Sequence, residues 1–158
     1  MCRSIWDKWC DWSMIKIICF GSIKEKYLKD LIDDYNKRIN KYHKLEIIEL
    51  KDNTDIKKET NELLKVLNIK EYNIALCIDG KTCDSVTFAN HLDNLFNYNS
   101  IVTFVIGGSN GLDESIIKMC KERISFSSLT FPHGLFRGIL LEQIYRSLKI
   151  NNNEAYHK

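Results

Sequence analysis

The sequence predicts an α/β protein whose mostly parallel sheet is covered by helices on both faces. From Met14 onward, strand-like apolar runs alternate with helix-like amphipathic runs, an order typical of parallel sheets. One run, IVTFVI at 101–106, is apolar throughout, as expected of a strand buried on both faces. The length of 158 residues suits a single domain with a substantial core.

The first half of the domain has the pattern of three strands separated by helices. The run MIKIICF is apolar and β-branched and ends at a Gly-Ser break, which predicts a strand. Apolar residues at three- and four-residue steps then predict an amphipathic helix. Its lysine-rich outer face could bind a polyanion, although such faces are usually only solvated. After a second strand, Thr54 is placed to cap the next helix. We expect strands at 14–20, 45–50 and 72–79, and helices at 24–42 and from Thr54 to about 68.

The second half continues the alternation and ends in an unusually apolar helix. Asp84 or Ser85 can cap the helix before strand 101–106. Pro132 suits the first turn of the last helix, where its missing N–H is not needed. Gly134 and Gly138 share one face of that helix and would let a partner helix, another backbone or a ligand come close. We expect helices from 85 to 96, from 112 to about 122 and from about 132 to 150, and strands at 101–106 and 124–131.

Composition narrows the functional classes without selecting one. The formal net charge of +2 neither demands nor excludes nucleic acid, so any RNA contact requires a local basic patch. No run approaches the roughly 20 apolar residues of a membrane span. The six cysteines include no C-x-x-C pair, so we expect no metal site, and without a secretory signal a reduced cytoplasmic setting is the default.

Residues 1–13, MCRSIWDKWCDWS, differ in composition from the rest of the chain. They contain all three tryptophans and lack the apolar core of a signal peptide. We interpret them as an appended or disordered leader in front of a single domain at 14–158. The alternative is a short amphipathic helix that packs its tryptophans onto the domain.

The loop GGSNG, after strand 101–106, is the strongest local signal for a binding site. In parallel sheets, ligands bind outside the carboxyl ends of the strands, where this loop and the segments after Asp79 and around 127–133 lie. The loop matches neither the dinucleotide fingerprint nor the P-loop. Asp113 and Glu114 open the next helix and would repel a phosphate, which favours a neutral or cationic ligand. The alternative is a plain turn between a strand and a helix.

Several polar residues near the C-terminus are open to two interpretations. Arg146 could pair with a carboxylate and favour the helix dipole, or it could hold RNA. His133 could bond the start of the last helix or line a pocket. Tyr156 and His157 belong to a tail that would normally fray, yet such residues can stack on a nucleotide base.

Three segments resemble a known family: FVIGGSNGL, ISFSSLTFPHGLFRGILLEQIYRSLKI and the terminal NEAYHK. They are similar to the bacterial ribosomal RNA large subunit methyltransferase H family, of the SPOUT class, and the resemblance runs from Met14 to Lys158. It implies a homodimer with a deep C-terminal trefoil knot and S-adenosylmethionine as the methyl donor. The implied substrate is N3 of a pseudouridine in the helix 69 loop of 23S ribosomal RNA, on the assembled ribosome.

The resemblance also implies site residues, matched motif by motif. The implied cofactor pocket consists of Leu76, Gly107, Phe126, Ser127, Ser128, Leu129, Thr130 and Phe131. Methylation of an imide nitrogen requires loss of its proton, which a general base or a stabilising cation would assist. The candidates for this role are His133, Arg146, Tyr156 and His157, reaching across the dimer.

Two departures from the family pattern accompany these motifs. The tryptophan-rich leader has no counterpart, and the connection from Leu50 to Leu63 is shorter than expected, which could alter docking to the ribosome. The alternative function is a noncatalytic, ribosome-associated RNA-binding module that needs no cofactor. A nucleotide-binding switch is disfavoured by the acidic start of the helix after GGSNG.

Overall fold

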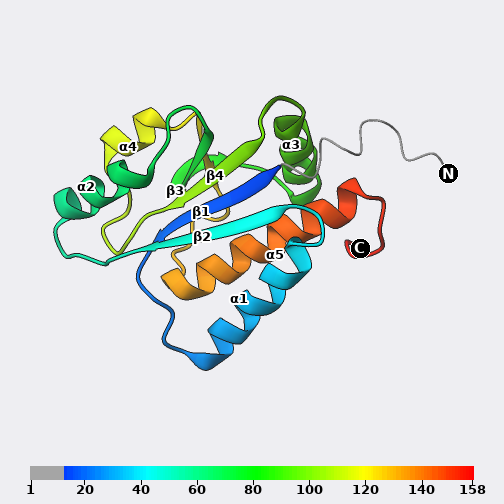
Figure 1. The fold of residues 1–158 in the computed structure, drawn as a ribbon, viewed down its shortest axis with the longest axis horizontal. Coiled ribbons are helices and arrows are strands. Elements are labelled where there is room, and N and C mark those ends of the chain that lie inside the picture. Colours follow the sequence, from blue (N-terminus) through cyan, green and yellow to red (C-terminus); the bar gives the residue numbers. More distant parts are fainter. Residues whose placement is uncertain (1–12) are drawn as a thin grey trace.

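The computed structural model describes residues 13–158, which form one five-stranded sheet in the order β2-β1-β4-β3-β5 (Figure 1). Each neighbouring pair of strands is parallel, which confirms the predicted sheet type. The strands are β1 (Met14–Phe20), β2 (Lys44–Leu50), β3 (Tyr72–Thr82), β4 (Ile101–Ile106) and β5 (Glu122–Ser125).

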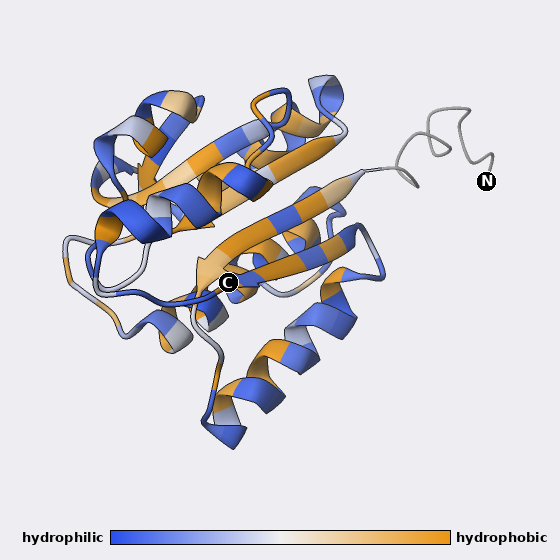
Figure 2. Cartoon of the chain, turned by 60° about the vertical axis from the view of Figure 1, so that its left-hand side comes forward, coloured by the Kyte–Doolittle hydropathy of each residue, from blue (hydrophilic) through white to orange (hydrophobic). Residues whose placement is uncertain are grey.

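Helices cover both faces of the sheet, as the sequence predicts. One apolar core joins α1, α3 and α5 to one face, and a smaller core joins α2 and α4 to the other. Figure 2 shows the apolar strands between helices whose outer faces are hydrophilic. The helices are α1 (Lys26–Ile39), α2 (Ile56–Val66), α3 (Ser85–Tyr98), α4 (Glu114–Met119) and α5 (His133–Asn151).

Aspartates cap three of these helices. Asp84 accepts a hydrogen bond from the backbone N–H of Thr87 at the start of α3, as expected for a cap there. At α2 the cap is Asp55 and not Thr54: its carboxylate accepts from the N–H of Lys57 at 2.9 Å. Asp113 caps α4 in the same way, so α4 begins after it and is shorter than the helix predicted at 112–122.

The predicted strand at 124–131 is wrong over most of its length. β5 ends at Ser125, and residues 126–131 form a loop. Local hydrogen bonds turn the chain there: the Ser125 hydroxyl donates to the carbonyl of Ser127, and the Ser127 hydroxyl accepts from the N–H of Leu129. Such side-chain bonds compete with a strand ladder, which the strand-like composition alone does not reveal.

The two glycines of α5 face α1 of the same chain. A Cβ at Gly138 would lie 2.9 Å from a methyl carbon of Leu31, and a Cβ at Gly134 would lie 3.0 Å from Ile23 and 3.1 Å from Leu28. The missing side chains therefore allow α1 and α5 to pack closely. Figure 1 shows these two helices side by side below the sheet. Of the approaches that the sequence leaves open, the structure selects a helix within the domain.

The predictions for the leader fall on residues 1–12, outside the part of the chain that the structure describes, apart from Ser13. Within residues 13–158, none of the helices combines the length and the apolar character needed to cross a membrane. The same part of the chain holds no group of three or more side chains arranged to bind a metal ion.

Candidate functional site

The carboxyl ends of β3, β4 and β5 border a cavity of about 430 Å³. Its walls come from residues 76–79 of β3, from the glycine loop at 107–112 and from the segment 126–136. We refer to it as the glycine-loop cavity. Its place agrees with the general rule that parallel sheets bind ligands at this edge.

Seven of the eight residues expected to bind the cofactor line the glycine-loop cavity. They are Leu76, Gly107, Phe126, Ser127, Leu129, Thr130 and Phe131. Ser128, the eighth, is exposed and does not line the cavity. His133 lines it too, at the start of α5.

Backbone packing makes glycine necessary at position 107. A Cβ there would lie 2.5 Å from the carbonyl carbon of Gly111 and 2.8 Å from the backbone nitrogen of Leu112. The loop closes on itself through a hydrogen bond from the N–H of Gly111 to the carbonyl of Gly108, and Gly111 has a φ of +72°. The chain thus folds back tightly at the cavity wall, where a ligand can reach the backbone.

The charged groups around this cavity suit a cation better than an anion. Asp79 and Glu114 line it, and Arg123 bonds both carboxylates, at 2.9 Å and 3.4 Å. Two carboxylates against one already paired guanidinium leave the lining acidic. This arrangement supports the expectation of a neutral or cationic ligand, because the two carboxylates would repel a pyrophosphate.

A second cavity, also of about 430 Å³, adjoins the first. Phe126 and Phe131 line both cavities, so the two cavities adjoin at these aromatic side chains. Gln143 of α5 and His157 of the C-terminal tail line the second cavity, and we refer to it as the tail cavity.

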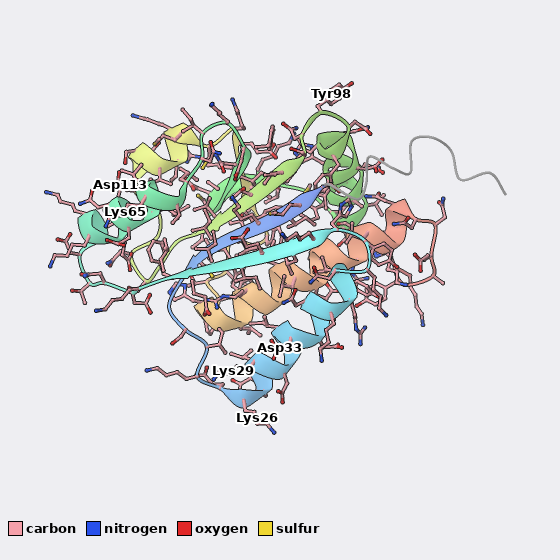
Figure 3. The ribbon with its side chains drawn as sticks, viewed as in Figure 1. Lys26, Lys29, Asp33, Lys65, Tyr98 and Asp113 are labelled. Atoms are coloured by element: carbon pink, nitrogen blue, oxygen red, sulfur yellow. The ribbon has the colours of Figure 1, made fainter. Side chains whose placement is uncertain are left out.

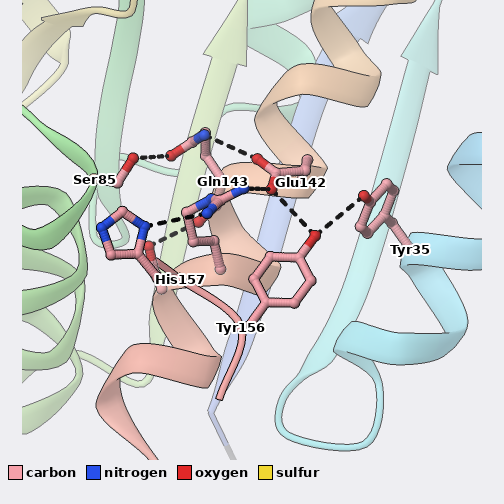
Figure 4. A network of polar contacts seen from close by, with 8 residues as sticks. Tyr35, Ser85, Glu142, Gln143, Tyr156 and His157 are labelled. Atoms are coloured by element: carbon pink, nitrogen blue, oxygen red, sulfur yellow. Dashed lines mark hydrogen bonds and ion pairs between the residues drawn. The ribbon is translucent and has the colours of Figure 1, made fainter. Parts of the chain in front are cut away.

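Three of the four candidate catalytic residues, Arg146, Tyr156 and His157, meet in one network beside the tail cavity. Figure 4 shows this network, with Tyr156 and His157 labelled. Arg146 forms an ion pair with Glu142 and donates a hydrogen bond to Nδ1 of His157 at 3.1 Å. Its guanidinium carbon lies 4.9 Å from the centre of the Tyr156 ring. The Tyr156 hydroxyl donates to Glu142 at 3.2 Å. His133 lies outside this network.

The network fixes the proton positions of its members. Burial raises the pKa of Tyr156, and the hydrogen bond with Tyr35 adds to this, so the phenol stays neutral in the physiological range. Arginine can only donate, so Nδ1 of His157 accepts and carries no proton in this arrangement. Tyr156 is thus a hydrogen-bond donor and not a base.

Sequence reasoning missed the residues that hold this network. Glu142 pairs with Arg146, and the Gln143 amide donates to Glu142 at 2.8 Å. Ser85, at the start of α3, donates to the Gln143 carbonyl oxygen at 2.8 Å. The spacing of Glu142 four residues before Arg146 was a readable signal, since such pairs meet on one helix face.

The C-terminal tail is bonded to its own chain. Glu154 accepts hydrogen bonds from the Tyr42 hydroxyl and the Lys149 ammonium, both at 2.7 Å. The backbone N–H of Glu154 also donates to the carbonyl of Lys149. These contacts favour an ordered tail over a frayed one, and they bring Tyr156 and His157 back to α5.

The family model described as "Predicted SPOUT methyltransferase" matches residues 14–157. This chain belongs to the SPOUT methyltransferases. Two curated relatives are named Ribosomal RNA large subunit methyltransferase H. The one from Clostridioides difficile (strain 630) is 46% identical, and the one from Clostridium botulinum (strain Eklund 17B / Type B) is 45% identical. Each match covers 91% of this chain and 99% of the relative.

Solved structures share the fold of this SPOUT methyltransferase at much lower identity. A probable methyltransferase from Bordetella pertussis Tohama I aligns with a TM-score of 0.51 and 11% identity, covering 87% of this chain and 95% of that one. A probable methylase family protein from Haemophilus influenzae Rd KW20 aligns with a TM-score of 0.54 and 9% identity, covering 94% and 71%. These similarities bear on the fold alone.

Proposed function

We propose that this SPOUT methyltransferase transfers a methyl group from S-adenosylmethionine to large-subunit ribosomal RNA, at N3 of a pseudouridine in the helix 69 loop. The observation that carries the proposal is the pair of adjoining cavities in a chain of this family. One is suited to a cationic cofactor, and the other lies beside a held arginine. The names of the curated relatives support RNA as the substrate.

The volume of the glycine-loop cavity, about 430 Å³, and the charge of its lining suit the proposed cofactor. Backbone of the glycine loop and side chains at 126–131 would hold its adenosine, and the acidic residues Asp79 and Glu114 favour its positive charge. When bound, S-adenosylmethionine supplies an electrophilic methyl group on a sulfonium. The shared walls Phe126 and Phe131 would orient the methyl toward the tail cavity.

In the proposed reaction the N3–H bond of the base breaks and its proton passes to solvent water, while N3 forms a bond to the methyl carbon. The carbon–sulfur bond of the donor breaks at the same step, and S-adenosylhomocysteine leaves with the bonding electron pair. Arg146 would stabilise the negative charge that develops on the base as its proton leaves. Nε2 of His157, which lines the tail cavity, would donate a hydrogen bond that orients the base there. Tyr156, whose hydroxyl donates to Glu142, would hold the Arg146 network in place. Gln143 offers an amide that can pair with an imide edge.

RNA and the partner subunit have candidate surfaces on this chain. Lys26 and Lys29 project from α1 into solvent beside Asp33, and Figure 3 shows this exposed face. Apolar side chains also lie exposed near the cavities and on α1, including Leu129, Leu135 and Tyr27. We propose that this apolar surface is buried in a homodimer with the knotted C-terminal topology of the family.

Calorimetric titration of the purified protein with S-adenosylmethionine is the first test. We expect saturable binding with about one site per chain and no binding of ATP, because the acidic lining opposes phosphate. Sedimentation of the same sample should give a dimer. A well-folded protein that does not bind S-adenosylmethionine would contradict the proposal and favour a noncatalytic RNA-binding module.

A further inference from the structure

Glu59 of α2 is a buried carboxylate that lies directly behind the glycine loop. Its side chain is only 2% exposed, which is unusual for glutamate. Oε1 accepts a hydrogen bond from the backbone N–H of Asn53 at 3.0 Å. Oε2 is also buried, and within residues 13–158 it has no hydrogen-bond partner.

The Glu59 carboxylate occupies the space that Gly108 leaves by having no side chain. A Cβ at position 108 would lie 2.7 Å from Oε1 and 2.8 Å from Oε2 of Glu59. Gly108 lines the glycine-loop cavity, whereas Glu59 does not. The carboxylate therefore packs against the side of Gly108 that faces away from the cavity, so that Gly108 lies between Glu59 and a bound ligand.

A second contact ties the same two segments together. The side-chain amide of Asn110 donates to the carbonyl of Thr54 at 2.9 Å. The glycine loop is thus held at Gly108 and at Asn110 by the segment 53–59, which precedes and opens α2. The first contact acts on a residue that lines the cavity, and the second acts on Asn110, which lies between two lining residues, Ser109 and Gly111.

Helix anchoring does not account for the carboxylate. Leu63, one turn further along α2, is buried in the smaller core and fixes the helix to the sheet. A buried carboxylate oxygen without a partner lowers stability. Its presence at this position points to a role other than stability.

We propose that Glu59 is a positioning residue for the cofactor site, which holds the glycine loop in its binding geometry without touching the ligand. This inference rests on the proposed function for the identity of the ligand, S-adenosylmethionine. It assigns to α2, on the opposite sheet face from α5, a direct part in building the site.

Three variants of the full-length protein test the proposal. Glu59→Ala should weaken S-adenosylmethionine binding at least tenfold in calorimetry, and Glu59→Asp, whose shorter side chain retreats from Gly108, should weaken it severalfold. Glu59→Gln keeps the shape and the acceptor for Asn53, so its affinity should stay within about threefold of the wild type. Glu62→Ala, an exposed glutamate of the same helix, is the matched control and should bind as the wild type.

Amide hydrogen exchange in the ligand-free protein separates this inference from the proposed function. Glu59→Ala and Glu59→Asp should speed exchange at residues 107–112 and leave that of β1 unchanged. If the wild type bound no S-adenosylmethionine, the proposed function would fail, and exchange in the loop would still decide the role of Glu59. Unchanged exchange in both variants would overturn the inference.

A double variant tests the contact itself. Gly108→Ala places a methyl group against the carboxylate, so we expect weaker cofactor binding and faster loop exchange. Combining it with Glu59→Ala removes the clash, so the combined loss of affinity should be clearly smaller than the product of the two single losses. Independent, multiplicative losses would contradict direct positioning through this contact.

Discussion

Three contacts fix the guanidinium of Arg146: the ion pair with Glu142, the hydrogen bond to His157 and the face of Tyr156. The sequence left open whether this arginine serves the helix or a ligand. The ion pair is present, and it places the cation beside a cavity instead of at a free surface. A charge held by neighbours in advance can stabilise an anion without reorganising.

Glu142→Gln tests the value of this arrangement. Hydrogen bonds to charged groups contribute about 1.5–3 kcal/mol, so loss of the ion pair should slow methyl transfer by roughly tenfold to a hundredfold. Affinity for S-adenosylmethionine should be unchanged, since Glu142 does not line the glycine-loop cavity. Single-turnover transfer measures the rate, with Glu46→Gln as an exposed control. Equal rates in variant and wild type would remove Arg146 from the proposed mechanism.

Gly107 and Ser128 give a paired test of the cofactor pocket. Gly107→Ala forces the backbone of Gly111 to move, so affinity for S-adenosylmethionine should fall more than tenfold while the oligomeric state is retained. Ser128 was expected in the pocket from family resemblance but lies outside the cavity, so Ser128→Ala should bind normally. Calorimetry with sedimentation measures both. A larger effect at Ser128 than at Gly107 would show that the cavity is not the cofactor site.

The buried thiol of Cys19 makes the free energy of unfolding depend on pH in the alkaline range. Burial raises its pKa from 9.0 to about 11, so the native thiol keeps its proton where the unfolded thiol loses it. This contribution is complete below pH 9 and declines as pH rises from about 9 to about 11, by up to about 1.4 kcal/mol per pH unit. Urea unfolding under reducing conditions should show a flatter decline in Cys19→Ala than in the wild type. Cys83→Ala, at an exposed position, should keep most of the slope.

At the scale of elements, α5 is tied to the strands β1 and β2 through one arginine. Its buried Arg137 forms an ion pair with Glu49 at 2.7 Å and donates to the carbonyls of Phe20 and Gly21. These groups lie at the carboxyl ends of β1 and β2, far in sequence from the helix. The sequence alone could not reveal these partners, because they lie more than eighty residues away along the chain.

Arg137→Ala should destabilise the fold strongly. The substitution removes the only charged donor that the described residues offer to the carbonyls of Phe20 and Gly21. Both carbonyls then lose their hydrogen bond to the guanidinium. We expect a loss of about 2–4 kcal/mol in the free energy of unfolding. Glu49→Gln, whose side chain is nearly half exposed, should cost less. Urea unfolding measures both, and an arginine variant as stable as the wild type would contradict this account.

Local chemistry explains which elements the sequence predicts well. Alternation of apolar runs gives the sheet and helices, and Asp84 announces the start of α3, because these signals act within a few residues. The prediction of a strand reaching Phe131 is wrong because the hydroxyls of Ser125 and Ser127 form hydrogen bonds with nearby backbone groups. Whether such bonds replace a strand ladder depends on the local geometry, which the composition does not reveal. Caps are similarly ambiguous where two cap-forming residues, Thr54 and Asp55, are adjacent.

At the scale of the whole molecule, the site is assembled by the order of the strands. β3, β4 and β5 are neighbours, so the segments that follow them meet at one edge although they are far apart in sequence. Motif resemblance identified the segments of the glycine-loop cavity. It could not identify Glu59, because only packing brings this side chain against Gly108. Glu142 lies outside the matched site residues, although its spacing from Arg146 within one helix could have indicated the ion pair.

The most direct test of the central claim is transfer of a labelled methyl group. The purified protein is incubated with methyl-labelled S-adenosylmethionine and with ribosomes whose 23S ribosomal RNA lacks the modification, and the RNA is then mapped by mass spectrometry. The account predicts one added methyl per large subunit, at N3 of a pseudouridine in the helix 69 loop. Absence of label in the RNA, with the cofactor bound and the protein folded, would contradict it.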